Sequence, residues 1–207
     1  VLEDLYKSVA DYVEKLYKNW YLSNLGKQWT TLVSDDMSKS SRLPGITQQA
    51  DFYKSYVKPI VSAGSRVYVI ISDALRYEVA VELTNKLLRE TKGTAKLSPM
   101  QSVFPSATKF GMAALLPHVN LQVTDDMAVL CDGESTEGTA NRDKILNSVH
   151  AGNVAMTYKT LLAMKQAERR EKVSNAQVVY IYHNAIDAVG DKASTEDQGF
   201  DACEQAD

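Results

Sequence analysis

Hydrophobic residues in the first part of the chain recur every three or four positions. The stripe over residues 1–22 consists of Leu2, Leu5, Tyr6, Val9, Tyr12, Val13, Leu16 and Tyr17, and Trp20 and Leu22 extend it. Side chains at this spacing share one face of an α-helix, so the pattern predicts an amphipathic packing helix. Polar turn formers over residues 34–45 predict a loop or linker. Residues 48–62 predict another helix, whose end is left open by Pro59.

Two later segments have the pattern of strands. Residues 67–71 and 178–182 are compact runs of β-branched and other apolar residues, typical of strands buried on both faces of a sheet. Further strands are predicted over residues 96–104 and around Val129. The helical patterns between the strands cover residues 74–90, 106–116, 143–149 and 157–172. The alternation predicts an α/β fold of three layers, αβα, with a mostly parallel sheet between helices.

The composition indicates a globular protein. Of the 207 residues, 44% are hydrophobic, which is enough for one substantial core. We expect a helical lead-in over residues 1–63 and an α/β core over residues 64–207. The formal net charge of −3 provides no overall basic field for nucleic acid, although a local basic groove stays open.

Cysteine usage and hydropathy predict a soluble cytoplasmic protein with no membrane partner. Cys131 and Cys203 lack metal-ligand spacing and are too few for a disulfide framework, which fits a reducing compartment. No apolar run approaches the roughly 20 residues that span a bilayer, and the start lacks a secretory signal. Because the chain opens at Val1 without methionine and stops at Asp207 within a helical pattern, we expect an excised fragment.

Asp73 directly follows the first buried strand. Ligands of open parallel sheets bind beyond the carboxyl ends of the strands, and an unpaired carboxylate there is costly unless a cation or a helix N-terminus compensates it. Asp73 is therefore a candidate metal ligand, although its position alone favours the alternative of a helix cap for residues 74–90. Arg76 is a candidate for phosphate binding, and an exposed ion pair with Glu78 is its favoured alternative.

Residues 104–111 join a strand end, a turn at Pro105 and hydroxyl groups at a helix start. The free N–H groups and the positive dipole end of a helix favour an oxyanion and a bound phosphate. Capping of the helix explains Ser106 easily but explains Thr108 less well. Lys109 adds a positive charge beside this candidate site, and an ordinary surface lysine is its favoured alternative.

Residues 183–191 form the most concentrated polar group that follows a strand. Asp187 and Asp191 are four residues apart, so in a helix both carboxylates share one face and can bind one divalent cation. Such a pair is a weak signal, and His183 is either a ligand or a hydrogen-bonded histidine at the strand end. Residues 132–139 carry glycines and hydroxyls without the ordered pattern of a nucleotide loop, so we expect a structured loop near the site.

Three segments of the chain are informative together: IISDALRYE, SVFPSATKFGMAALLPH and YHNAIDAVGDK. In combination they resemble the PglZ family, members of the alkaline phosphatase superfamily associated with phage-growth-limitation and phage-exclusion (BREX) systems. The resemblance spans most of residues 64–207. It implies a partial fold of the alkaline-phosphatase type, with residues 1–63 as an N-terminal helical segment.

The resemblance also implies roles for individual residues. Asp73 corresponds to the metal-binding aspartate of the first strand, and Thr108 to the nucleophile, which also binds metal. Asp187 and Asp191 match a pair of metal ligands, with aspartate in place of the usual histidine, so expectation shifts from zinc toward manganese or magnesium. The superfamily's later Asp-His-Gly segment, which supplies ligands to a second metal, does not occur in these residues. Two metals are therefore expected only in a longer protein.

The leading hypothesis is a metal-dependent phosphoesterase in phage defence, acting as a phosphatase, phosphodiesterase or nuclease. Arg76 and Lys109 would bind the substrate phosphate, and the expected partners are phosphate esters, including nucleic acid, and other defence proteins. The alternative is an inactive phosphatase-like assembly module, motivated by Asp191 and the aromatic-rich first helix. A dinucleotide-binding domain is excluded because no G-x-G-x-x-G follows either buried strand.

Overall fold

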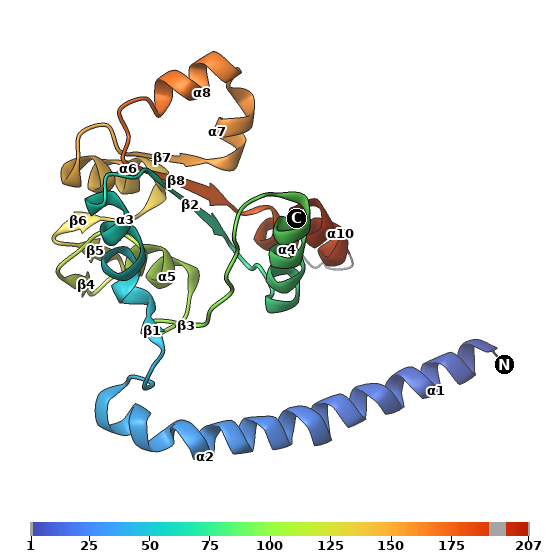
Figure 1. Cartoon of the computed structure of the whole chain (residues 1–207). Helices are drawn as coiled ribbons and strands as arrows, with labels where there is room; N and C mark the ends of the chain where they lie inside the picture. The colour runs from blue at the N-terminus through green and yellow to red at the C-terminus, as the bar shows by residue number, and fades with distance from the viewer. Residues whose placement is uncertain (1, 191–197, 207) are drawn as a thin grey trace. The chain divides into compact units, whose positions relative to one another are not determined.

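The computed structural model describes residues 2–190 and 198–206 (Figure 1). The chain divides into two compact units, Val1–Ile46 and Thr47–Asp207. Each unit is described by itself below.

The first unit is a run of consecutive helical segments. These are α1 (Leu2–Lys15), the π-helical segment η1 (Leu16–Leu22) and α2 (Ser23–Ser40). Every residue in them is at least partly exposed. The run ends where Ser41 takes a left-handed backbone conformation with φ 53°, while its N–H donates to the carbonyl of Met37.

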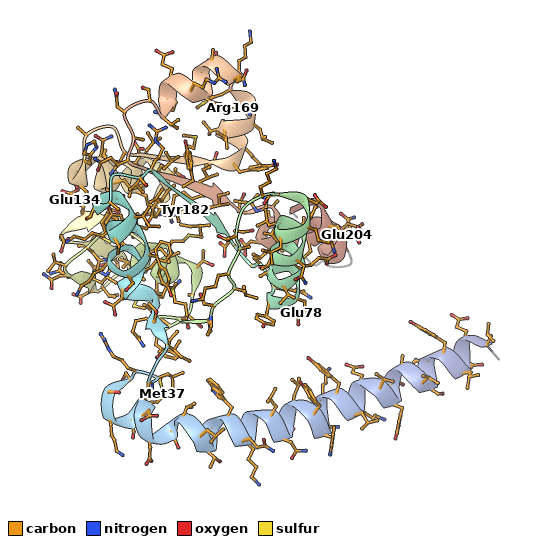
Figure 2. The ribbon with its side chains drawn as sticks, in the orientation of Figure 1. Met37, Glu78, Glu134, Arg169, Tyr182 and Glu204 are labelled. Carbon is orange, nitrogen blue, oxygen red and sulfur yellow. The ribbon has the colours of Figure 1, made fainter. Side chains whose placement is uncertain are left out.

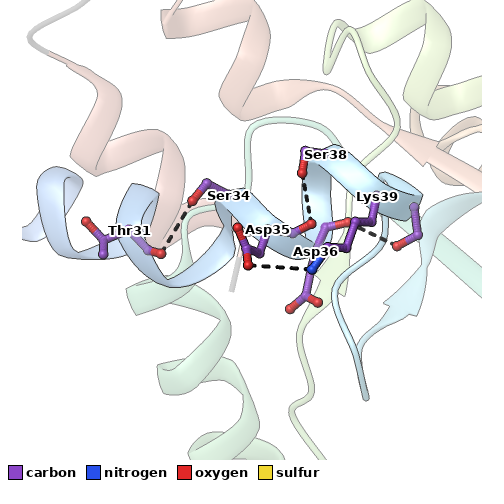
Figure 3. A network of polar contacts seen from close by, with 7 residues as sticks. Thr31, Ser34, Asp35, Asp36, Ser38 and Lys39 are labelled. Carbon is purple, nitrogen blue, oxygen red and sulfur yellow. Dashed lines mark hydrogen bonds and ion pairs between the residues drawn. The ribbon is translucent and has the colours of Figure 1, made fainter.

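The loop predicted over residues 34–45 is wrong in its first half, because α2 continues to Ser40. Serine hydroxyls there donate back to helix carbonyls, as Ser34 does to Thr31 at 3.4 Å and Ser38 to Asp35 at 3.0 Å (Figure 3). The Lys39 ammonium also lies 3.5 Å from the Asp35 carboxylate one turn away. These local contacts satisfy the polar side chains within the helix, which composition alone does not reveal.

A three-stranded parallel sheet forms the centre of the second unit. Its strands are β2 (Val67–Ser72), β8 (Val178–His183) and β7 (Val154–Thr157), in the order β2-β8-β7. The sequence predicted β2 and β8 but not β7. A strand of four residues that leads straight into helix α7 carries too short a pattern to be recognised.

Apolar clusters cover both faces of the central strand β8, all six residues of which are buried. On one face Val178, Tyr180 and Tyr182 pack with Val69 and the core residues of α5 and α6. On the other face Val179 and Ile181 pack with Val154 and Met156 of β7 and with partly buried residues in and next to α7 and α8, namely Leu161, Met164 and Val173. The predicted three-layer α/β arrangement with a parallel sheet is thus confirmed (Figure 1).

Shorter elements complete the second unit. A two-stranded parallel sheet pairs β1 (Thr47–Gln48) with β3 (Met100–Gln101), and an antiparallel sheet joins β4 (Leu121–Val123), β5 (Val129–Cys131) and β6 (Glu134–Ser135). The helical elements are η2 (Gln49–Asp51), η3 (Tyr53–Val57), α3 (Lys58–Ser62), α4 (Tyr77–Glu90), α5 (Thr108–Ala114), α6 (Gly138–Val149), α7 (Tyr158–Ala163), α8 (Gln166–Lys172), α9 (Ala185–Gly190) and α10 (Gly199–Ala206). Of the strand predicted over residues 96–104, only Met100–Gln101 is extended and paired.

The boundary between the two units also differs from the expected division at residues 63 and 64. Residues 47–63 belong to the second unit. They pair with β3 through β1 and supply Val57, which is 1% exposed, to the main core. A helical pattern over residues 48–62 shows that an apolar face must be buried, but it does not show against which partner.

A buried asparagine holds the amino-terminal end of β8. Asn153 is 1% exposed, and its side-chain oxygen accepts hydrogen bonds from the backbone N–H groups of Gln177, at 3.1 Å, and Val178, at 2.9 Å. Its side-chain nitrogen donates to the carbonyl of Leu146 at 3.2 Å. The neighbouring Gly152 has φ +100°, and a Cβ there would lie 2.9 Å from a backbone oxygen. This turn therefore links α6, β7 and β8 through one polar side chain.

Candidate functional site

The candidate site begins at the carboxyl ends of β2 and β8, which are adjacent and parallel. Ser72 and His183 are register partners, and the N–H of Asp73 donates to the carbonyl of His183 at 2.8 Å. The strand pairing therefore extends one residue past β2. It brings the two polar segments that follow these strands to the same edge of the sheet, as parallel pairing requires.

Asp73 is half-buried and is not a helix cap. Ala74 takes a positive φ of 61°, and helix α4 begins only at Tyr77, with Arg76 as its N-cap residue. The left-handed residue interrupts the chain between strand and helix, so the predicted helix start at residue 74 and the capping alternative are both wrong. Arg76 and Glu78 are exposed at the start of α4, where Figure 2 labels Glu78.

His183 has the contacts of a structural residue at the strand end. It is buried, its Nδ1 lies 2.9 Å from the Ser72 hydroxyl oxygen, and its ring meets Tyr158 edge-on with centroids 4.9 Å apart. Of the two readings left open by the sequence, these contacts favour the hydrogen-bonded histidine. The sequence analysis did not single out Ser72, although its place beside Asp73 at a strand end was a usable signal.

Asp187 lies in the first turn of α9, four residues after β8 ends. It is half-buried, and the adjacent Ile186 is buried and anchors the helix to the core. Asp191, the second member of the predicted pair, lies outside the described residues. The structure therefore describes one carboxylate after β2 and one after β8, on neighbouring strand ends.

Thr108 is the first residue of α5 and is exposed. The N-cap residue is Ala107, with extended backbone angles and no side-chain cap, so Ser106 does not cap this helix. Buried side chains such as Phe110 fix α5 against the core, and the Tyr180 hydroxyl on β8 donates to the carbonyl of Leu115 at 2.6 Å. The nucleophile candidate thus comes from a well-anchored helix.

Lys109 is exposed beside Thr108. Its ammonium lies 5.3 Å from the centroid of the Phe110 ring, which is a cation–π distance. The charge also contributes, as the smallest of several causes, to a lowered pKa of Asp126, for which the hydrogen bond from the Thr124 hydroxyl is the main cause. Lys109 is therefore an exposed surface lysine beside the nucleophile candidate.

The buried groups behind the site are neutral. Burial raises the pKa of Tyr182 to about 12, against the opposing charge of Arg142, whose guanidinium carbon lies 4.7 Å from the Tyr182 ring centroid. Burial likewise raises the pKa of the Cys131 thiol to about 12. Figure 2 shows Tyr182 within the densely packed interior of the second unit. These groups stay protonated at neutral pH and act as packing residues.

The loop over residues 132–139 proves to be a β-hairpin turn followed by the start of α6. Asp132, with φ 50°, and Gly133, with φ 89°, connect β5 to β6. The Asp132 carboxylate accepts the backbone N–H groups of Asn120 at 2.8 Å and Val119 at 3.0 Å, which lower its pKa. The N–H groups that could bind a phosphate in this turn are thus already occupied by the Asp132 carboxylate, so the turn has a structural role.

The carboxylates form no dense metal-binding cluster in the described ranges. Among residues 2–190 and 198–206, no group of three or more histidine, cysteine, aspartate and glutamate side chains has the arrangement for holding a metal ion. Asp73 and Asp187 stay predicted oxygen ligands, and the Thr108 hydroxyl is a predicted oxygen donor of a second kind, outside that search. An oxygen-only set of this type suits a hard cation.

The fold and this edge define a class: a mixed α/β domain with acidic residues after adjacent parallel strands. Residues 52–207 match the family described as the BREX system PglZ alkaline phosphatase-like domain, and the chain belongs to this PglZ family. The resemblance seen in the sequence is thereby confirmed. Among residues 2–190 and 198–206, no helix is both long enough and apolar enough to cross a membrane.

Two curated relatives extend the match over nearly the whole chain. The alkaline phosphatase-like protein BrxZ of Escherichia coli O9:H4 (strain HS) is 46% identical over 205 residues, which cover 97% of this chain. The alkaline phosphatase-like protein PglZ of Bacillus cereus (strain H3081.97) is 40% identical over 203 residues, or 98% of this chain. The chain spans 24% of the length of each relative.

Proposed function

We propose that this chain contributes the nucleophile and one side of the metal site of a phosphoesterase in a BREX-type phage defence system. The observation that carries the proposal is the pairing of β2 with β8, by which Asp73 and Asp187 follow adjacent strand ends. The exposed hydroxyl of Thr108 and family membership support it.

Asp73 and Asp187 would hold a divalent cation, with Asp191 as a further ligand. Their oxygen ligands favour Mg²⁺ or Mn²⁺ over Zn²⁺, although zinc also accepts carboxylates. Once bound, the cation supplies positive charge that stabilises the ionised Thr108 hydroxyl and the substrate phosphate. A second cation would take ligands from beyond these residues in a protein of the relatives' length.

Side chains of this chain would carry out nucleophilic attack, bind the phosphate and position the metal ligands. The Thr108 oxygen attacks phosphorus and the ester oxygen leaves, and water then cleaves the phosphothreonine. Arg76 and Lys109, both exposed, bind the non-bridging phosphate oxygens through charge-assisted hydrogen bonds. The hydrogen bond between the side chains of Ser72 and His183 holds the two strand ends in register. This would keep the carboxylates of Asp73 and Asp187 in place.

The substrate is a phosphate ester, either a monoester, a diester or nucleic acid. The same core supports all three, and the surrounding pockets decide among them. Other proteins of the defence system are the proposed partners, and the cytoplasm is the proposed location.

Metal binding and hydrolysis test the proposal separately. Calorimetry of the 207-residue chain with Mg²⁺, Mn²⁺ and Zn²⁺ should show binding that Asp73→Asn and Asp187→Asn each weaken at least about tenfold. The exposed Asp125→Asn is the matched control and should leave the affinity unchanged. If all three variants bound the metal with the affinity of the wild type, Asp73 and Asp187 would not be metal ligands.

Hydrolysis of aryl phosphate mono- and diesters then tests the nucleophile, in a protein of the relatives' length. Thr108→Ala should lower kcat by roughly 10³-fold or more, whereas the neighbouring Ser106→Ala should retain activity. Full activity in Thr108→Ala would refute its role as nucleophile. Metal binding with no hydrolysis of any ester would favour the assembly module instead.

A further inference from the structure

The long helix of the first unit carries an apolar face that its own unit leaves uncovered. Between Leu2 and Leu32, fourteen large apolar side chains are 40% to 83% exposed, and six of them are tyrosine or tryptophan. Isolated exposed hydrophobic residues are normal on a protein surface, but a continuous stripe of this size marks an interaction site. Tyrosine and tryptophan are also the residues most enriched at the centres of protein interfaces.

The π-helical segment brings two separate apolar stretches onto one side. In an uninterrupted α-helix, the stretch containing Leu25, Trp29 and Leu32 would lie roughly 200° around the axis from the stretch containing Leu5 and Val9. A π-helix closes its hydrogen bonds one residue later and turns less per residue, so seven such residues turn the second stretch back by roughly 100°. This halves the angle between the two stretches to roughly 100°, so that both lie within one half of the helix surface.

We propose that this face pairs with the same face of a second copy of the chain, in an antiparallel arrangement centred near Tyr21. Tyr21 is the midpoint of Leu2–Ser40, which α1, η1 and α2 span. In such a pair Val13 lies opposite Trp29 of the other copy, Tyr17 lies opposite Leu25, and Tyr21 meets its own counterpart. Large apolar side chains therefore meet large apolar side chains through the middle of the pair.

Charge at the helix ends selects the antiparallel direction. The first turn carries Glu3 and Asp4, and the end of α2 carries Asp35, Asp36 and Lys39. Antiparallel pairing centred near Tyr21 sets Glu3 opposite Lys39 and Lys7 opposite Asp35 of the other copy, and it also opposes the two helix dipoles. Parallel pairing would place Glu3 and Asp4 beside the same residues of the other copy and would align the two helix dipoles.

The available area is sufficient for a stable dimer. A standard specific interface buries about 800 Å² on each partner. Shared among fourteen side chains, this is about 60 Å² each, well within the 150–250 Å² that a single aromatic side chain can bury. A membrane surface fits less well, because helices that bind it are rich in lysine and arginine. Residues 2–22 carry four acidic and three basic side chains.

Sedimentation of the 207-residue chain tests the pairing. We expect a species of twice 22.9 kDa, or about 46 kDa, at micromolar concentration. Val13→Glu, on the stripe, should raise the dissociation constant of the dimer at least about thirtyfold, whereas Asn19→Glu, on the polar side, should change it less than about threefold. Far-UV circular dichroism of each variant checks that the helix and the second unit remain folded.

Cysteine crosslinking tests the direction of the pair, since both native cysteines are buried. Tyr21→Cys should form an intermolecular disulfide with itself. Val13→Cys should crosslink only to Trp29→Cys in a mixture, because two copies of residue 13 would lie about 24 Å apart in the antiparallel pair. Crosslinking of Val13→Cys to itself would overturn the arrangement. A monomeric wild type, including one that binds phosphatidylserine vesicles, would overturn the pairing itself.

Discussion

Replacement of Asn153 by alanine should destabilise the second unit severely. The side chain makes three hydrogen bonds at a position that is 1% exposed. Its removal leaves the N–H groups of Gln177 and Val178 without this acceptor, whereas the Leu146 carbonyl still accepts from the N–H of His150. Each buried backbone group left unsatisfied costs about 1–3 kcal/mol. Because water partly fills the space of the lost amide, we expect a loss of about 3–5 kcal/mol in the free energy of unfolding.

Urea unfolding followed by circular dichroism measures this loss. Asn141→Ala is the matched control, since its side chain makes one exposed hydrogen bond, to the carbonyl of Glu137 at 2.8 Å. We expect that variant to lose less than about 1 kcal/mol. A loss below 1 kcal/mol for Asn153→Ala, or equal losses in the two variants, would refute the assignment of the buried amide as the anchor of β8.

Three further predictions concern other parts of the second unit. The lowered pKa of Asp132 means that its carboxylate stabilises the fold above pH about 4 and loses this contribution as the pH falls through the folded-state pKa. Asp132→Asn should therefore lower the melting temperature at pH 7, and the difference from wild type should disappear in acid; a constant difference would contradict the assignment. Gly152→Ala should cost about 2 kcal/mol because φ is +100° and the new Cβ would meet a backbone oxygen, and urea unfolding measures this cost. The pKa of the Cys131 thiol is about 12, so roughly one part in 10⁴ of it is ionised at pH 8. In a Cys203→Ser variant, where Cys131 is the remaining cysteine, we expect reaction with a disulfide reagent only after denaturation.

The sequence predicted most reliably those elements whose pattern directly reflects their surroundings. Strands β2 and β8 are runs of β-branched and other apolar residues, and β8 is buried on both faces as that pattern indicates. For β2 the prediction of burial on both faces is wrong, because Tyr68 is 53% and Ile70 is 68% exposed. Strand β7 was missed because four residues that lead into a helix contain too little pattern. The later start of α4 depends on the left-handed backbone of Ala74, a conformation that alanine rarely adopts and no pattern reveals.

The candidate site was predicted in part by the same logic. The rule that ligands lie beyond the carboxyl ends of parallel strands pointed to Asp73 and Asp187, and the structure places them after neighbouring strands. That Ser72 is bonded to His183 depends on the register between two strands distant in sequence, which spacing along the chain does not contain. The roles of Thr108 and the carboxylates stay predictions until the metal and the ester are tested.

The neighbouring positions of β2 and β8 also set the order in which this domain folds. Ser72 and His183 are 111 residues apart, whereas β7 and β8 belong to one short strand-helix-strand segment that can close early. At a synthesis rate of about 5–20 residues per second, β2 therefore waits roughly 5–20 s on the ribosome before its partner strand exists. During that interval both edges of the apolar strand β2 are unpaired, whereas in the folded sheet β8 covers one of them, so the waiting strand is open to aggregation.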